Sequence, residues 1–179
     1  LLDFVDHAAD FLQHDQVETA ERLTDPQEVL GVVSPGEGVA TFDTPDGRIG
    51  VLICYDRSFP EAWRTLVLSG ADAVFVPVVS YGFREEMFLA ELRTRASENG
   101  VWALAANRVG AEEVEGNEVL MFGTSCVVDP AGAVVAQAGS GRDRRGDEIV
   151  VAEIDLAEAQ RQKLRVPYFR DRRPDIYRL

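Results

Sequence analysis

Apolar runs alternate with amphipathic stretches along most of this chain. Three largely apolar runs have the length of buried strands: 48–54, 73–79 and 101–106. Between them, the stretches 58–69 and 83–99 have the apolar spacing of helices, and Gly70 and Gly100 follow as stop signals. Strands that alternate with helices in this way indicate an α/β fold with some parallel strand pairs.

Turn signals divide the rest of the chain. Thr44-Pro45-Asp46-Gly47 predicts a hairpin over 39–54, and Asp129-Pro130-Ala131-Gly132 predicts a second one between strands 123–128 and 133–138. A final strand over 149–154 and a final helix over 156–164 are expected before a charged tail. At the other end, a short amphipathic helix is expected over 3–13 and an irregular polar segment over 14–37.

The start of the helix at 58–69 has a specific signature. Ser58 is expected as its N-cap, Pro60 suits the first turn, and Glu61 stands three residues after the cap, as in a capping box. A helix that begins here follows directly on Cys54, the last residue of the preceding apolar run. This order places a thiol at the carboxyl end of a strand, where open α/β sheets bind their ligands.

Length and charge narrow the class of protein. The 179 residues suffice for one domain over 1–179, and the net charge of −13 disfavours nucleic acid and anionic lipid as partners. No apolar run approaches the ~20 residues of a membrane helix, and the start does not resemble a signal peptide. We therefore expect a cytoplasmic protein. Because the chain lacks an initiator methionine, we also expect a fragment or a processed product.

The bias in charge has two readings. Lys163 is the single lysine, and every other basic residue is arginine. A GC-rich coding bias explains this composition, and so does a salt-adapted cytoplasm in which a carboxylate-rich surface maintains solubility. Both readings stay open on the sequence alone.

The cysteines and histidines argue against metal and disulfide chemistry. Cys54 and Cys126 lie in strand-like runs rather than in loops, which is typical of reduced thiols. His7 and His14 are the only histidines, and no CxxC or HExxH pattern occurs. We therefore expect no zinc site from these residues.

Cys54 is the strongest candidate for covalent chemistry. An isolated cysteine in a strand usually packs in a core, and this reading suits Cys126. Cys54, however, ends its strand, and the polar residues Asp56 and Arg57 follow it. The backbone amides of such a turn, with a helix start behind them, can stabilise a thiolate and an oxyanion.

The run Ile53-Cys54-Tyr55-Asp56-Arg57-Ser58-Phe59-Pro60-Glu61 resembles the nucleophile motif of the nitrilase, or carbon–nitrogen hydrolase, superfamily. Further stretches resemble the family in the same order: 47–50, 70–77, 91–99, 106–110, 122–125 and 128–132. The tail at 170–177 resembles the branch that hydrolyses N-carbamoyl amines. The resemblance covers about residues 34–179.

This resemblance implies a four-layer α-β-β-α sandwich with mixed sheets, of which the N-terminal portion is missing here. It also implies a homodimer or larger homo-oligomer that hydrolyses small linear amides or N-carbamoyl amines without a cofactor. In the family mechanism a Cys attacks the substrate, a Glu acts as base and a Lys stabilises the oxyanion. Cys54 matches the nucleophile, and the Tyr55 N–H would supply one oxyanion contact.

Other residues have less specific assignments. Glu28 is a loose match to an auxiliary glutamate, and a solvated loop carboxylate explains it as well. Asp56, Arg57, Tyr81 and Asn107 are candidate substrate-binding residues. Asp56 and Arg57 could equally hold the turn after Cys54, and Asn107 could equally serve a turn. Phe83 is a further candidate for the pocket wall.

The chain departs from the family where two catalytic groups are expected. The catalytic Glu belongs to the N-terminal half, which has no counterpart here. The stretch that matches the position of the catalytic Lys has none; Ala20 lies near the expected place, and Lys163 lies in the wrong region. We therefore expect the isolated chain to be inactive. Two alternatives remain: a non-catalytic binding relative, and an unrelated thiol enzyme that uses His7 or His14.

Overall fold

The computed structural model describes residues 38–114, 116–141 and 146–177. Contacts within the chain divide it into two compact units, Leu1–Gly38 and Val39–Leu179. The helix expected over 3–13, the polar segment over 14–37, Glu28 and both histidines lie outside the described residues. The assignment of residues 1–179 to one domain stays a prediction.

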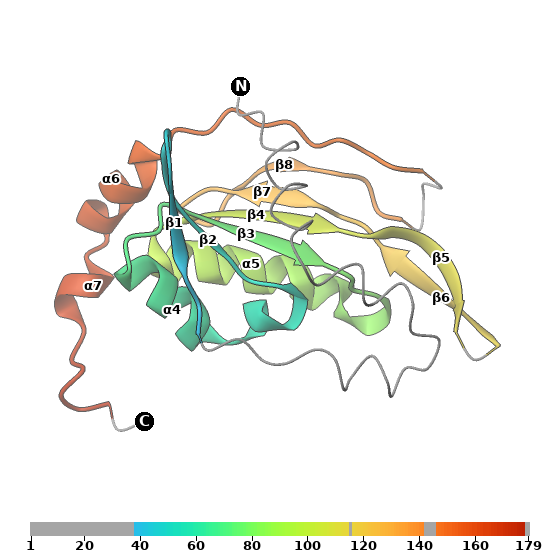
Figure 1. Cartoon of the computed structure of the whole chain (residues 1–179), viewed down its shortest axis with the longest axis horizontal. Coiled ribbons are helices and arrows are strands. Elements are labelled where there is room, and N and C mark those ends of the chain that lie inside the picture. The colour runs from blue at the N-terminus through green and yellow to red at the C-terminus, as the bar shows by residue number, and fades with distance from the viewer. Residues whose placement is uncertain (1–37, 115, 142–145, 178–179) are drawn as a thin grey trace. The chain divides into compact units, whose positions relative to one another are not determined.

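A six-stranded mixed sheet forms the centre of the unit Val39–Leu179, in the order β1-β2-β3-β4-β7-β8 (Figure 1). Its strands are β1 (Thr41–Thr44), β2 (Gly47–Val51), β3 (Ala73–Val78), β4 (Trp102–Asn107), β7 (Cys126–Val128) and β8 (Val134–Gln137). The pairs β2–β3 and β3–β4 are parallel, whereas both hairpins and the pair β4–β7 are antiparallel. The α/β class and both predicted hairpins are confirmed.

Two helices, α4 (Pro60–Leu68) and α5 (Glu85–Asn99), lie on the same side of the sheet (Figure 1). Trp63 and Leu66 of α4 and Phe88 and Leu92 of α5 are fully or almost fully buried against it. Alternate strand residues such as Val74 and Val76 complete this core, as the two-residue period of a strand requires. The helix at 83–99 is confirmed apart from its first turn, which is the 3₁₀ helix η2 (Gly82–Arg84). Gly100 ends α5 with a left-handed φ of 57°.

The opposite face of the sheet has a smaller core. Trp102 and Val127 are buried there with Ala159 of the helix α6 (Ala157–Arg165). The indole of Trp102 donates a hydrogen bond to the Asp155 carbonyl oxygen at 3.0 Å. A last helix, α7 (Tyr168–Asp171), precedes the tail, which ends the described part of the chain.

The strand predicted over 149–154 is wrong. The segment is extended, but it belongs to no ladder, and Figure 1 draws it as a plain orange ribbon beside the sheet. The alternation that suggested a strand is nevertheless present. Val150, Ala152 and Ile154 pack against the smaller core, while Ile149 and Val151 are 88% and 73% exposed.

A second, two-stranded sheet went unpredicted. It consists of β5 (Val109–Val114) and β6 (Asn117–Phe122), which pair in antiparallel register. Its acidic residues hide the strand pattern, because Glu112, Glu113 and Glu118 have low strand propensity. Gly116, with a φ of 77°, was the available turn signal.

The predicted start of α4 is also wrong. Phe59 is its N-cap, and no side chain caps the helix. Ser58 instead belongs to the 3₁₀ helix η1 (Cys54–Ser58), and its hydroxyl lies within hydrogen-bond distance of Glu91 and Arg84. Pro60 does occupy the first helical turn, as predicted. Among the described residues, no helix is long and apolar enough to span a bilayer.

Candidate active site

The chain turns sharply at Cys54, immediately after β2. The Leu52 N–H still donates to the Phe75 carbonyl oxygen at 2.9 Å, which extends the β2–β3 pairing by one residue. Cys54 then adopts a φ of 48°, and only one other non-glycine residue in the described chain, Thr124, has a positive φ. This left-handed conformation costs an L-residue about 1–2 kcal/mol. Such strain clusters at functional sites and persists only where the surroundings impose it.

Hydrogen bonds close the turn around Cys54. The Ile53 N–H donates to Asp56 Oδ2 at 3.1 Å, and the Asp56 N–H donates back to the Ile53 carbonyl oxygen at 3.0 Å. Arg57 Nη1 donates to the Cys54 carbonyl oxygen at 2.7 Å. Two of the predicted site residues, Asp56 and Arg57, thus hold the turn by contacts within the protein.

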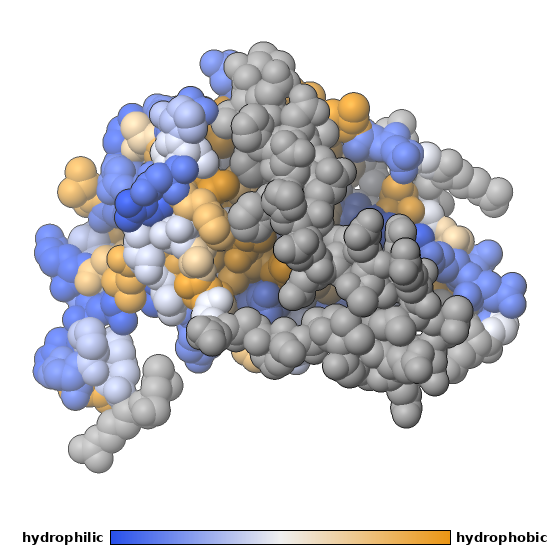
Figure 2. Space-filling model, viewed as in Figure 1, coloured by the Kyte–Doolittle hydropathy of each residue, from blue (hydrophilic) through white to orange (hydrophobic). Residues whose placement is uncertain are grey.

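The thiol itself is half-buried, with Cys54 Sγ 3.6 Å from the Val79 carbonyl oxygen. The Tyr55 N–H has no hydrogen-bond acceptor among the described residues. Large apolar side chains stay partly exposed around the thiol: Ile53, Tyr55, Phe59, Val79 and Tyr81. Figure 2 shows hydrophobic residues interspersed with hydrophilic ones on one face of the molecule.

Arg57 is the most deeply placed charge at this site, with a side chain only 2% exposed. Burial lowers the pKa of its guanidinium, and the nearby Glu91 carboxylate opposes that shift. Arg57 Nε lies 3.3 Å from Glu91 Oε2, and Nη2 donates to the Ser80 hydroxyl at 3.2 Å. The guanidinium also lies over the Phe88 ring, 5.2 Å from its centroid.

Glu91 was not singled out by the sequence analysis. This residue of α5 forms an ion pair with a second arginine, since Arg84 Nη2 lies 2.8 Å from Glu91 Oε1. The signal was present in the helical spacing, since Arg84 and Glu91 are seven residues apart and so lie on one face. What the spacing could not reveal is that this face meets the turn after Cys54.

Asn107 lies at the end of β4 and is nearly buried. Its Oδ1 accepts a hydrogen bond from the Ser80 N–H at 2.9 Å, and its Nδ2 donates to the Gly123 carbonyl oxygen at 2.7 Å. The side chain therefore ties the ends of β3 and β4 to the residue after β6. Both of its polar atoms are engaged within the protein.

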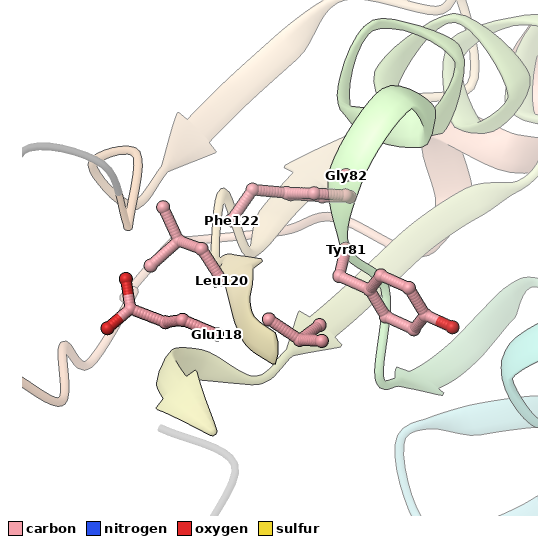
Figure 3. A pocket seen from close by; sticks show the side chains of 6 residues that line it. Tyr81, Gly82, Glu118, Leu120 and Phe122 are labelled. Atoms are coloured by element: carbon pink, nitrogen blue, oxygen red, sulfur yellow. The ribbon is translucent and has the colours of Figure 1, made fainter. Parts of the chain in front are cut away.

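A pocket lies past the carboxyl end of β3, and no residue of the turn after Cys54 lines it. It is lined by Tyr81, Gly82, Glu118, Val119, Leu120 and Phe122, and its volume is about 260 Å³. Figure 3 shows Leu120, Phe122 and Glu118 of β6 on one side of it and Tyr81 on the other. Tyr81, which lines the pocket, follows Val79 by two residues, and the Val79 carbonyl oxygen contacts the Cys54 thiol.

Two other candidate groups lie away from the site. Cys126 is buried in the core, as expected, and burial raises the pKa of its thiol to about 11. Lys163 Nζ lies 3.5 Å from the Ala71 carbonyl oxygen, ahead of β3, and burial lowers its pKa. Because Val79 follows the far end of that strand, the lysine is about 25 Å from the thiol. No group of three or more metal-binding side chains occurs among the described residues.

Comparisons with known proteins agree with this geometry. A family model described as carbon–nitrogen hydrolase matches residues 12–164. The chain is similar to an N-carbamoylputrescine amidase of Arabidopsis thaliana, at 34% identity over 158 residues that cover 82% of this chain and 52% of the relative. It thus spans about half the length of the curated relatives that it matches.

Solved structures show the same relationship. A carbon–nitrogen hydrolase from Helicobacter pylori G27 superimposes with a TM-score of 0.74 at 31% identity, over 82% of this chain and 53% of that one. A variant amidase from Nesterenkonia sp. AN1 superimposes with a TM-score of 0.64 at 27% identity, over 87% and 52%. That variant carries the acetamide moiety of fluoroacetamide covalently added at its active-site cysteine.

Proposed function

Since the chain belongs to the carbon–nitrogen hydrolase family, we propose that it forms the nucleophile-bearing part of an amidase or N-carbamoyl amine hydrolase. The nitrilase-like fold agrees with this role. The chain covers about half of each related structure, and the relatives contain a further half. One observation carries the proposal: within residues 38–114, 116–141 and 146–177, only Cys54 combines a half-buried thiol, a left-handed backbone and a following N–H group with no acceptor among those residues.

Cys54 acts as the nucleophile in this proposal. Its thiolate attacks the carbonyl carbon of a small amide, and the Tyr55 N–H donates a hydrogen bond to the developing oxyanion. The C–N bond then breaks, and ammonia or an amine leaves after it takes up a proton. Water cleaves the resulting thioester, which releases the acid and restores the thiol.

The other predicted residues take roles that follow from their contacts. Tyr81 and the apolar wall of β6 contact the part of the substrate beyond the carbonyl, since they line the neighbouring pocket. Asp56, Arg57 and Asn107 position the site, because each of these side chains makes hydrogen bonds within the protein. The auxiliary role of Glu28 stays a prediction.

The general base and the oxyanion lysine come from outside the described residues in this proposal. The lysine lies outside the 179 residues altogether, because Lys163 is the only one and it is remote from the thiol. By itself, the chain therefore binds and hydrolyses amides poorly or not at all. The full enzyme is proposed to be cytoplasmic, as its two free thiols suggest, and to be a homo-oligomer, as the family resemblance implies.

The absence of a lysine near the thiol also favours a second candidate function. A relative that kept the fold and lost the oxyanion lysine would bind an amide or a partner subunit without turnover. Ammonia release by the full open reading frame that contains this sequence separates the two. Release that disappears in Cys54→Ser supports the hydrolase, whereas binding of an amide without release supports the binding protein.

A further inference from the structure

Arg57 and Glu91 form a buried ion pair directly beneath the proposed nucleophile. Both oxygens of Glu91 face arginines, with Arg57 Nε at 3.3 Å and Arg84 Nη2 at 2.8 Å. Arg57 in turn reaches the Cys54 carbonyl oxygen at 2.7 Å and the Ser80 hydroxyl at 3.2 Å. The Arg57 guanidinium thus contacts Glu91 on α5, Ser80 after the end of β3, and Cys54, the residue with the left-handed backbone.

The hydrogen bonds of Arg57 are directional. A guanidinium is a planar fork whose donors point in fixed directions, so its two hydrogen bonds, to the Cys54 carbonyl oxygen and to the Ser80 hydroxyl, define its orientation. The fork binds the peptide oxygen of Cys54, which is the group that must rotate if φ leaves its left-handed value of 48°. The Glu91 carboxylate attracts the guanidinium by its charge, at ion-pair distance and without a hydrogen bond to Nε, and the Phe88 ring lies against the face of the guanidinium.

Stability alone does not explain this arrangement. A buried ion pair is costly to desolvate, and well-packed apolar residues often serve a core as well or better. The neighbouring core is apolar, with Trp63, Phe88 and Leu92 almost fully buried. A charged pair in this place therefore suggests a requirement for direction, which apolar packing does not supply.

We propose that Glu91, acting through Arg57, is the positioning residue that holds Cys54 in its left-handed conformation and so presents the thiol for attack. Without that hold, Cys54 relaxes to an ordinary φ, and its sulfur turns away from the Tyr55 N–H. The inference rests on the proposed role of Cys54 as nucleophile. It can nevertheless be tested on thiol reactivity alone, without turnover.

The experiment measures the rate at which iodoacetamide alkylates Cys54 in the folded chain, with peptide mapping to assign the adduct. Glu91→Gln keeps the size of the side chain and removes its charge. Glu86→Gln, an exposed position on the same helix, is the matched control. Buried Cys126 reports unfolding, because it is alkylated only when the core opens.

We expect Glu91→Gln to slow alkylation of Cys54 about tenfold while Cys126 stays unmodified, and Glu86→Gln to match the parent. Arg57→Lys, which keeps the charge but loses the fork, should slow it to a similar extent. If Glu91→Gln unfolds the chain, both cysteines are alkylated. The rate at which Cys54 is alkylated in Arg57→Lys then tests the inference instead. Parental rates at Cys54 in a folded variant that has only lost thermal stability would overturn the inference.

A kinetic split separates this inference from the proposed function. In the full open reading frame, Glu91→Gln should lower kcat per active site and leave KM unchanged, because the substrate does not touch Glu91. A merely structural role would leave kcat per folded site unchanged. If Cys54→Ser keeps full activity, the proposed function fails, whereas the alkylation result on Glu91 stands by itself.

Discussion

The sulfur of Cys54 lies 3.6 Å from the carbonyl oxygen of Val79, so the thiol bridges the ends of the parallel strands β2 and β3. This contact brings together two segments that are 25 residues apart in the chain. Tyr81, which lines the pocket, follows Val79 by two residues. The segment 79–81 thus contacts the proposed reacting atom at one end and lines the proposed substrate site at the other.

Asn107→Asp should destabilise the protein without changing the pocket wall. A carboxylate cannot donate to the Gly123 carbonyl oxygen, which would keep only the hydrogen bond from the Thr124 hydroxyl and would face a buried negative charge. We expect a loss of about 1–3 kcal/mol in the free energy of unfolding, measured by urea denaturation. A parental unfolding midpoint combined with a raised KM would instead make Asn107 a substrate contact.

Stability should fall in alkaline solution because of Cys126. Burial raises the pKa of its thiol from 9.0 to about 11, so the unfolded chain loses this proton at lower pH than the folded chain. The contribution of the protonated Cys126 thiol to the free energy of unfolding is fully present below pH 9 and is lost as pH rises through 11. The total loss is about 2–3 kcal/mol. Unfolding midpoints between pH 8 and 11 measure it, and Cys126→Ala should flatten the slope over this range. An equal slope in both proteins would contradict the assignment.

The two tryptophans offer a matched pair of substitutions. Trp63 Nε1 donates to the Arg57 carbonyl oxygen at 2.8 Å, whereas Trp102 Nε1 donates to the Asp155 carbonyl oxygen on the other face of the sheet. Trp63→Phe and Trp102→Phe should each cost about 1–3 kcal/mol of stability. Only Trp63→Phe should also slow alkylation of Cys54. Equal alkylation rates in both variants would show that the hydrogen bond from Trp63 to Arg57 has no effect on the reactivity of the Cys54 thiol.

Tyr81 should affect substrate binding more than turnover. Tyr81→Ala removes one wall of the pocket and should raise KM about tenfold in the full open reading frame, with kcat little changed. Tyr81→Phe keeps the ring and serves as the control, and it should stay near the parental KM. Parental kinetics in Tyr81→Ala would place the substrate elsewhere.

Local patterns predicted much of the fold. The sheet strands at 48–54, 73–79 and 101–106 and both hairpins follow from apolar runs and from Pro, Asp and Gly in the turns. The strand over 149–154 failed because alternation reports which side chains are buried, whereas strand assignment also requires a partner for the backbone. The hairpin of β5 and β6 was missed because its glutamates mask the alternation.

The sequence supplied candidates for the site but not their contacts, for a physical reason. Position after a strand selected Cys54, Asp56 and Arg57 as candidates. The direction in which a side chain points depends on tertiary contacts, so the sequence left open whether Arg57 holds the turn or faces a substrate; in the structure its side chain is 2% exposed and donates to the Cys54 carbonyl oxygen. Its partner Glu91 lies 34 residues later, and no local pattern connects the two.

The proposed role of Cys54 is tested most directly by mass spectrometry of the covalent intermediate. The full open reading frame is mixed with a small amide, quenched in acid during turnover and digested for peptide mapping. We predict that the acyl group is found on the peptide that contains Cys54, is absent from Cys126, and disappears together with ammonia release in Cys54→Ser. Ammonia release that persists in Cys54→Ser, or an acyl group carried by a different residue, would contradict the account.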